Sequence, residues 1–137
     1  MNVFVYGTLL VPRIWELVTE CPDLDSTEAF LKGHSIWTVK GATFPAIREE
    51  SPSHESLVRG RVYFDIPAPA LQRLDLYEDS FYERVPIKVH TKGGIVDADV
   101  YRAPQEKADA IVSENPWSLE WFEMNGLEDF LRNVFDH

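Results

Sequence analysis

The spacing of Glu78 from two leucines before it predicts a carboxylate that is suited to proton transfer. Glu78 follows Leu71 by seven residues and Leu74 by four, so the three side chains share one face of a continued helix. Because the two leucines must face the core, the carboxylate on that face is desolvated, which raises its pKa. A Glu of this kind can give and take protons near neutral pH. The alternative is a helix that ends earlier and leaves Glu78 solvated beside Asp79.

A second group of potential chemical importance is the backbone of residues 7–10. Residues 3–6 are β-branched or aromatic and predict a buried strand, which Gly7 interrupts before Pro12 opens an amphipathic helix. Such a turn leaves consecutive N–H groups without ladder partners, and they could converge on an anion or a carbonyl oxygen. The alternative is an ordinary turn between a strand and a helix.

Two motifs connect these groups to a known family. The first is Tyr6-Gly7-Thr8-Leu9, and the second is Leu74-Asp75-Leu76-Tyr77-Glu78-Asp79 followed by Tyr82-Glu83-Arg84. In this order and separation they resemble the γ-glutamylcyclotransferase-like superfamily, from residue 2 to about residue 102. The Tyr-Gly-Thr-Leu form is closer to the γ-glutamylamine and plant avirulence-induced-gene-like branch than to the glutathione-specific branch.

The resemblance implies a fold, a site and a reaction. The fold would be α+β, a small mixed β-barrel flanked by helices. Glu78 would be the catalytic acid and base, and the substrate contacts would come from Tyr6, Gly7, Thr8, Leu9, Leu10 and Tyr82. Tyr6 itself is expected in the core or just behind the loop residues that contact the substrate. No metal and no cofactor is implied, and the partner would be a small γ-glutamyl molecule.

The reaction implied is an intramolecular aminolysis. The free α-amine of a γ-glutamyl compound attacks its own γ-carbonyl, which closes 5-oxoproline and expels the other amine. One carboxylate can take the proton from the α-ammonium and return it to the leaving amine, while loop amides stabilise the oxyanion. Two other classes of function stay open: a non-catalytic binding module with the same pocket, and an interaction protein that works through its C-terminal helices.

Other polar residues offer weaker candidates. Tyr82 could bind substrate through its hydroxyl or simply pack at the surface, and for Tyr101 packing is the better interpretation. Arg84 is expected to have a structural role. The histidines show no metal-ligand spacing, and Cys21 has no neighbouring His that would make it a nucleophile. Those histidines are His34, His54, His90 and His137.

Composition limits the class of protein. The 137 residues predict a single domain, with the barrel at about 1–102 and a helical tail at about 115–137. A formal charge of −10 argues against nucleic acid or an anionic membrane as a partner. No apolar run approaches the ~20 residues of a membrane span, and the first strand leaves no room for a signal peptide. A cytoplasmic location is therefore expected, and the oligomeric state stays unknown.

The remaining elements must position the two motifs. Short strands are expected at 28–31 and 35–39, with Pro45 on an edge or irregular crossing. Residues 57–66 predict a strand in which Gly60 marks a bulge, a bend or a close backbone approach. Alternation predicts a hairpin over 81–89 and 96–100. In the tail, Asn115-Pro116 suggests a helix start, Gly126 separates two helices, and the stripe of Leu127, Phe130, Leu131 and Val134 should pack on the core.

Overall fold

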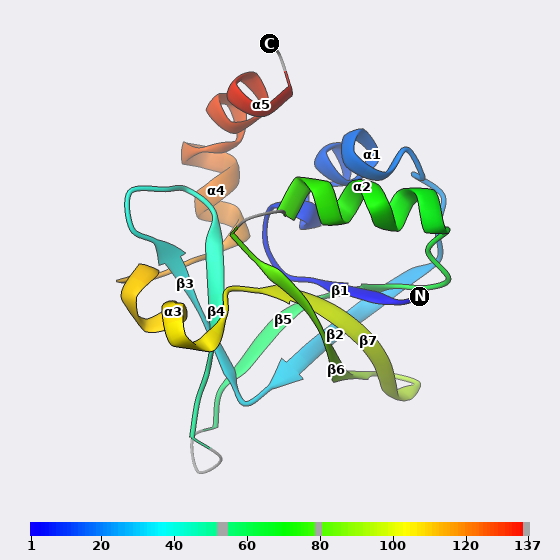
Figure 1. Cartoon of the computed structure of the whole chain (residues 1–137), viewed down its shortest axis with the longest axis horizontal. Coiled ribbons are helices and arrows are strands. Elements are labelled where there is room, and N and C mark those ends of the chain that lie inside the picture. The colour runs from blue at the N-terminus through cyan, green and yellow to red at the C-terminus, as the bar shows by residue number, and fades with distance from the viewer. Residues whose placement is uncertain (52–54, 79–80, 136–137) are drawn as a thin grey trace.

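The centre of the protein is a closed barrel of mixed strand direction (Figure 1). The computed structural model describes residues 1–51, 55–78 and 81–135. Within them, the strand order around the barrel is β1 (Val3–Val5), β5 (Leu57–Tyr63), β2 (Ser26–Lys32), β6 (Glu83–Thr91) and β7 (Gly94–Arg102). Parallel pairing of β1 with β7, Val3 opposite Asp99, closes the barrel, and the other pairs are antiparallel. The predicted mixed barrel is confirmed.

Gly60 allows two parts of the barrel wall to approach closely. It pairs with Ala29 in a continuous register between β5 and β2. A Cβ atom at this position would lie 2.1 Å from the carbonyl oxygen of Val5 and 2.9 Å from the ring of Phe4. Of the three explanations that the sequence left open, the structure therefore favours the close backbone approach.

A smaller sheet stands beside the barrel. Its order is β4 (Pro45–Glu49), β3 (His34–Val39) and β8 (Val112–Pro116). Pro45 begins β4, an edge strand of this sheet, which agrees with the predicted position of this proline.

Residues 105–116 differ from the sequence prediction. Instead of starting a helix at Asn115-Pro116, the chain forms α3 (Gln105–Ile111) and then β8, in which Pro116 pairs with Trp37. The next helix, α4 (Leu119–Asn125), is capped by Ser118, whose hydroxyl accepts from the N–H of Trp121 at 3.1 Å. Backbone pairing with a distant strand thus outweighs the local capping signal.

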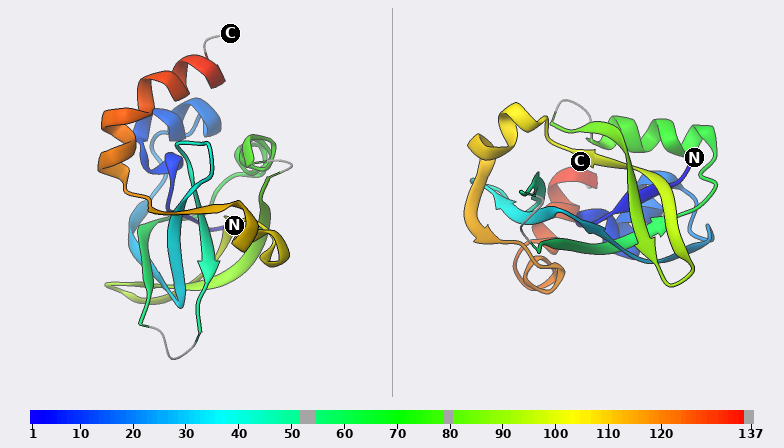
Figure 2. Two further views of the ribbon diagram at one scale, coloured as in Figure 1. Left: turned by 90° about the vertical axis from the view of Figure 1, so that its left-hand side faces the viewer. Right: turned by 90° about the horizontal axis from the view of Figure 1, so that it is seen from below.

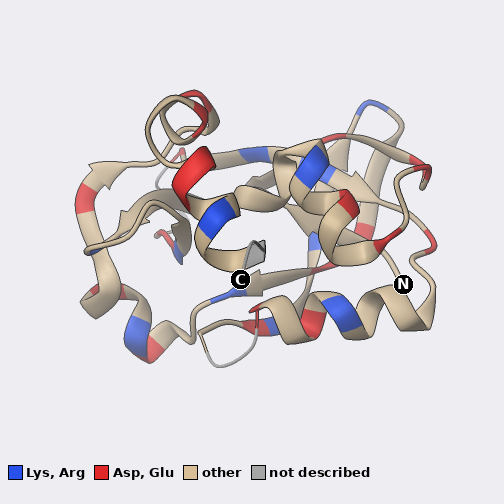
Figure 3. Ribbon diagram, turned by 90° about the horizontal axis from the view of Figure 1, so that it is seen from above, with Lys and Arg blue, Asp and Glu red and all other residues tan. Residues whose placement is uncertain are grey.

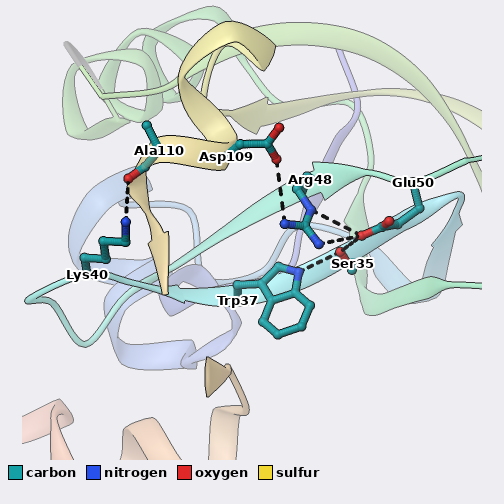
Figure 4. Close-up of polar contacts among 7 residues, drawn as sticks. All are labelled: Ser35, Trp37, Lys40, Arg48, Glu50, Asp109 and Ala110. Carbon is teal, nitrogen blue, oxygen red and sulfur yellow. Dashed lines mark hydrogen bonds and ion pairs between the residues drawn. The ribbon is translucent and has the colours of Figure 1, made fainter. Parts of the chain in front are cut away.

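Side-chain contacts hold this segment in place (Figure 4). Lys40 donates to the carbonyl of Ala110 at 3.1 Å, and Arg48 lies 3.7 Å from the carboxylate of Asp109. Ser113 donates to the carbonyl of Thr38 at 2.7 Å. The connection after the barrel is thereby fixed to the small sheet, which positions the start of the tail helices.

Apart from α3, which lies beside the small sheet, the helices of the described chain lie on one side of the barrel (Figures 1 and 2). They are α1 (Pro12–Thr19) and α2 (Ala68–Glu78), which pack side by side, together with α4 and α5 (Leu127–Phe135). Trp15 of α1 stacks on Tyr63 of β5 with ring centroids 3.7 Å apart, which joins this helix to the barrel. None of the helices in the described part of the chain combines the length and apolar composition that a membrane crossing requires.

The tail helices complete the core on this side. Gly126 separates α4 from α5, as predicted. Leu127, Phe130 and Leu131 pack against the main hydrophobic cluster, which contains Trp15 and Phe122. Val134, the last residue of the predicted stripe, is 39% exposed.

Candidate functional site

A cavity of about 230 Å³ lies where the barrel meets the helices. Its walls come from the end of β1, the loop after it, the C-terminal end of α2, the start of β4 and α5. The lining residues are Phe4, Val5, Tyr6, Gly7, Thr8, Leu9, Phe44, Pro45, Tyr77, Glu78, Phe81, Tyr82, Tyr101, Phe130 and Val134. The cavity therefore brings together the two sequence motifs, which lie about seventy residues apart in the chain.

Glu78 is the acidic residue of this cavity. It is the last residue of α2, so the helix does continue far enough to place Glu78 on the same face as Leu74, which is fully buried. Burial raises the pKa of the Glu78 carboxyl to about 8, because the charged form loses hydration. No Lys, Arg or His is found among the described residues that line the cavity, so no cationic side chain there offsets this desolvation.

The loop after β1 forms the wall that contains the first motif. Gly7 is required there because a Cβ atom would lie 2.8 Å from Cγ of Pro45. Residues Thr8–Leu10 form a short 3₁₀ turn, η1, in which the N–H of Leu10 donates to the carbonyl of Gly7 at 2.9 Å. The amides of Thr8 and Leu9 come too early in this turn to find an intrahelical acceptor, and they have no hydrogen-bond partner in the described chain.

The sequence prediction also included Leu10 among the substrate contacts. It is not among the cavity-lining residues, and its amide is already used within the turn. The loop groups that the structure brings to Glu78 are therefore those of Gly7, Thr8 and Leu9.

Three tyrosine hydroxyls tie the walls of the cavity together. Tyr6 donates to the carbonyl of Tyr101 at 2.7 Å, and Tyr82 donates to the carbonyl of Pro45 at 2.5 Å. The hydroxyls of Tyr77 and Thr8 are 2.9 Å apart, which connects α2 to the loop. Burial is the largest cause of the raised pKa of all three tyrosines, so they stay neutral. Tyr6 is buried, as expected, and Tyr82 keeps acceptor lone pairs beside its donated bond.

Arg84 lies in an ionic network outside the cavity lining. Its Nε is 3.4 Å from a carboxylate oxygen of Asp75 and 3.7 Å from one of Asp99, so it joins α2 to β7. Tyr101 donates to the same Asp75 at 2.6 Å, while its side chain also lines the cavity. This arrangement agrees with the structural role expected for Arg84.

The other polar candidates lie elsewhere. Across residues 1–51, 55–78 and 81–135, no group of three or more His, Cys, Asp or Glu could hold a metal ion. Cys21 is partly buried, and its carbonyl accepts from the indole N–H of Trp15 at 3.0 Å. His54, His137 and Asp79 lie outside the described residues. Basic and acidic segments alternate over the helical side in the described chain, without a continuous basic band (Figure 3).

Sequence reasoning missed the aromatic part of the cavity. Phe44 and Phe81 meet edge to face at 5.4 Å, and Phe130 lies at 6.4 Å from Tyr77. Phe130 and Val134 are four residues apart on α5, which the sequence assigned to the core stripe alone. Tyr77 lay inside the second motif, although nothing in its spacing indicated the contact with Thr8.

Comparison with known proteins gives the family of the chain, and the family model covers every cavity-lining segment except α5. A family model described as gamma-glutamyl cyclotransferase, AIG2-like, matches residues 3–119. Protein AIG2 A of Arabidopsis thaliana is 26% identical over 130 residues, which cover 95% of this chain and 74% of that protein. Protein AIG2 B of the same plant is 32% identical over 88 residues, 64% of this chain and half of its own length.

Solved structures show the same barrel. An Arabidopsis thaliana protein determined in solution superposes with a TM-score of 0.70 at 26% identity, over 98% of this chain and 79% of that one. A gamma-glutamyl cyclotransferase superposes with a TM-score of 0.64 at 18% identity, over 96% of this chain and 98% of that one. The sequence match and the shared fold agree, and the chain belongs to the gamma-glutamyl cyclotransferase, AIG2-like family.

Proposed function

We propose that this protein is an enzyme that releases 5-oxoproline from a γ-glutamyl amine, amino acid or peptide, with Glu78 as its acid and base. The observation that carries the proposal is the position of Glu78, a desolvated carboxylate in the same cavity as the Gly7–Leu9 loop. A pure binding module has no use for a carboxylate that burial keeps ready to exchange protons near neutral pH. Family membership supports a small γ-glutamyl molecule as the substrate.

The first step is a proton transfer. When the α-ammonium of the substrate enters opposite Glu78, the pair shares a single proton: either carboxylate with ammonium or carboxylic acid with free amine. Burial raises the pKa of Glu78 in the empty cavity from 4.5 to about 8, so the neutral pair lies closer in free energy to the ionic pair than it would for a solvated carboxylate, although the ammonium itself favours the ionic pair. The free amine is therefore accessible without a large energetic cost, and it is the nucleophile.

The second step closes the ring. The amine nitrogen bonds to the γ-carbonyl carbon, and the carbonyl oxygen takes up the negative charge. The unpartnered amides of Thr8 and Leu9 are candidates to donate to this oxygen. Glu78 then gives its proton to the nitrogen of the leaving amine, and the original carbon–nitrogen bond breaks. The ring nitrogen, which gained a positive charge when it attacked, loses its second proton to the Glu78 carboxylate. Glu78 passes this proton to the departing amine, so that 5-oxoproline and an ammonium ion leave and the carboxylate is restored. Because both reacting groups belong to one molecule, positioning in the cavity supplies much of the rate.

The test is a product assay with the wild-type protein. A panel of γ-glutamyl amines, amino acids and peptides is incubated with the protein, and 5-oxoproline is measured directly. The proposal expects release from at least one member of the panel. A protein that binds members of the panel but releases nothing would be a binding module. A protein that neither binds nor releases would point to a different use of the fold, such as interaction through the tail helices.

A further inference from the structure

We propose that Asp75 and Arg84 are positioning residues for Glu78: as a charge pair that brackets the segment between them, they hold its carboxylate in place for proton transfer. This inference rests on the proposed function and adds to it two residues that do not line the cavity. The pair closes a short stretch of chain, because Nε of Arg84 lies 3.4 Å from Oδ1 of Asp75. The cavity-lining residues that lie between them in the chain are Tyr77, Glu78, Phe81 and Tyr82.

Asp75 and Glu78 share one face of α2. They are three residues apart, so Asp75 lies one helical turn before Glu78, which is the last residue of the helix. On the other side of Glu78, the N–H of Tyr82 donates to the Glu78 carbonyl at 3.2 Å. Arg84 follows two residues later, in β6. The position of Glu78 therefore depends on contacts made just before it and just after it in the chain, and the charge pair joins the two.

Strand pairing places the other members of the network beside this pair. Arg84 of β6 pairs directly with Tyr101 of β7, and Asp99 is two residues before Tyr101, so the three side chains lie on one face of the hairpin. The hydroxyl of Tyr101 donates to Asp75 at 2.6 Å, the length of a charge-assisted hydrogen bond. Tyr101 also lines the cavity, and its carbonyl accepts from Tyr6 at 2.7 Å. Asp75 thus connects the helix that contains Glu78 to a side chain of the cavity wall.

The geometry of Arg84 favours a role beyond stability. Its Nε lies 3.4 Å from Asp75 and 3.7 Å from Asp99, longer than the about 2.7–2.9 Å of a charge-assisted hydrogen bond. Its Nη1 is buried and has no hydrogen-bond partner in the described chain. A buried donor that is left unpaired costs free energy, so an ion pair that served stability alone would use it. The guanidinium instead places one positive charge between two carboxylates behind the cavity wall.

The other titratable groups around Glu78 are neutral. The hydroxyls that face it in the described cavity belong to four tyrosines whose pKa is raised, chiefly by burial: Tyr6, Tyr77, Tyr82 and Tyr101. The lining residues from β4 and α5 are not titratable. Besides Glu78, the charged groups that act on these tyrosines are Asp75, Arg84 and Arg102. Since Asp75 lies one helical turn from Glu78, removal of either charge of the pair should change the pKa of Glu78.

Steady-state release of 5-oxoproline from a γ-glutamyl substrate that the wild type turns over gives the first test. Arg84→Gln removes the charge and keeps a polar side chain. Because Arg84 does not line the cavity, KM should change little, whereas kcat should fall by ~10- to 100-fold, the cost of a small displacement of a reacting group. Lys88→Gln is the matched control. It removes an exposed ion pair with Asp97 from the same hairpin, and it should match the wild type in both constants.

The pH profile separates positioning from a merely structural role. The rising limb of kcat/KM against pH reports deprotonation of Glu78 in the free enzyme. Arg84→Gln leaves the negative charge of Asp75 unbalanced, which disfavours the Glu78 carboxylate, so the limb should move to higher pH by about half a unit. Asp75→Asn removes a negative charge and should move the limb to lower pH by a similar amount. The double variant should restore the wild-type limb, and so should Arg84→Lys, which keeps the charge.

Two results would overturn the positioning role. One is a kcat of Arg84→Gln equal to that of the wild type. The other is a rising limb that stays in place in both Arg84→Gln and Asp75→Asn, because a pair that only stabilised the fold would lower the melting temperature without moving the limb. Circular dichroism and melting curves check that the variants fold. If Arg84→Gln does not fold, the limb of Asp75→Asn decides.

The proposed function can fail separately. A wild type that releases no 5-oxoproline would overturn it, and the coupling of the pair to Glu78 is then read without turnover. Urea denaturation from pH 5 to pH 9, with and without Glu78→Gln, isolates the titration of Glu78. In the Arg84→Gln background this titration should move to higher pH by about half a unit. A titration that does not move would overturn the coupling as well.

Discussion

Replacing Glu78 with Gln should make the stability of the protein less dependent on pH. The substitution keeps the size of the side chain but removes the titrating carboxyl, which burial shifts from 4.5 to a pKa of about 8 in the folded protein. Between these two values the folded state holds a proton that the unfolded state has released. The free energy of unfolding of the wild type therefore falls as the pH rises from about 4.5 to about 8, and levels off above.

The size of this effect follows from the shift. At about 1.36 kcal/mol per pH unit, the interval between the two pKa values corresponds to at most about 5 kcal/mol. The Glu78 residue is partly exposed, so solvent screens its charge and the measured value should lie below this limit. Glu78→Gln does not titrate in this range, so its free energy of unfolding should not fall in this way. The difference in free energy of unfolding between the variant and the wild type should therefore shift in favour of the variant by a few kcal/mol from pH 5 to pH 9.

Urea denaturation at pH 5, 7 and 9 measures the difference. Glu16→Gln is the matched control, since Glu16 is an exposed residue of α1 and its replacement should give a nearly constant difference from the wild type. If Glu78→Gln also differs from the wild type by the same amount at every pH, the carboxyl of Glu78 is solvated in the folded protein and the argument from desolvation is wrong.

Two further predictions concern the elements that frame the cavity. Gly60→Ala should lower stability by about 1–3 kcal/mol or more, because the added methyl would lie 2.1 Å from the carbonyl oxygen of Val5; an unchanged melting temperature would contradict the close approach of the strands. Deleting residues 126–137 should lower the melting temperature, because Leu127 and Phe130 pack on the main cluster. A truncated protein that melts unchanged but loses an oligomer would show that the stripe is an interface.

Local sequence patterns were sufficient to predict those elements whose structure depends on residues close together in the chain. The spacing of Leu71, Leu74 and Glu78 predicted the helix face correctly, because a continuous α2 fixes all three directions. The alternation around the turn of Gly93 and Gly94 likewise predicted the hairpin of β6 and β7, whose strands pair directly.

Local sequence patterns gave the wrong structure where contacts with a segment distant in the chain determine it. Asn115 has the side chain of a helix cap, but residues 112–116 find backbone partners on β3, and Ser118 caps the helix instead. The aromatic part of the cavity had no sequence signal for the same reason. Phe44, Phe81 and Phe130 belong to segments that only tertiary packing brings around one cavity.

The role of Glu78 in turnover is the central claim, and single-turnover release of 5-oxoproline tests it most directly. With a saturating substrate, Glu78→Gln should reduce the rate by ~10²–10⁴-fold, the usual worth of general acid–base catalysis. Binding of the same substrate, measured by calorimetry, should weaken far less, and Glu16→Gln should match the wild type in both. A Glu78→Gln protein that releases 5-oxoproline at the wild-type rate would contradict the account, since the carboxylate would then have no part in the proton transfers.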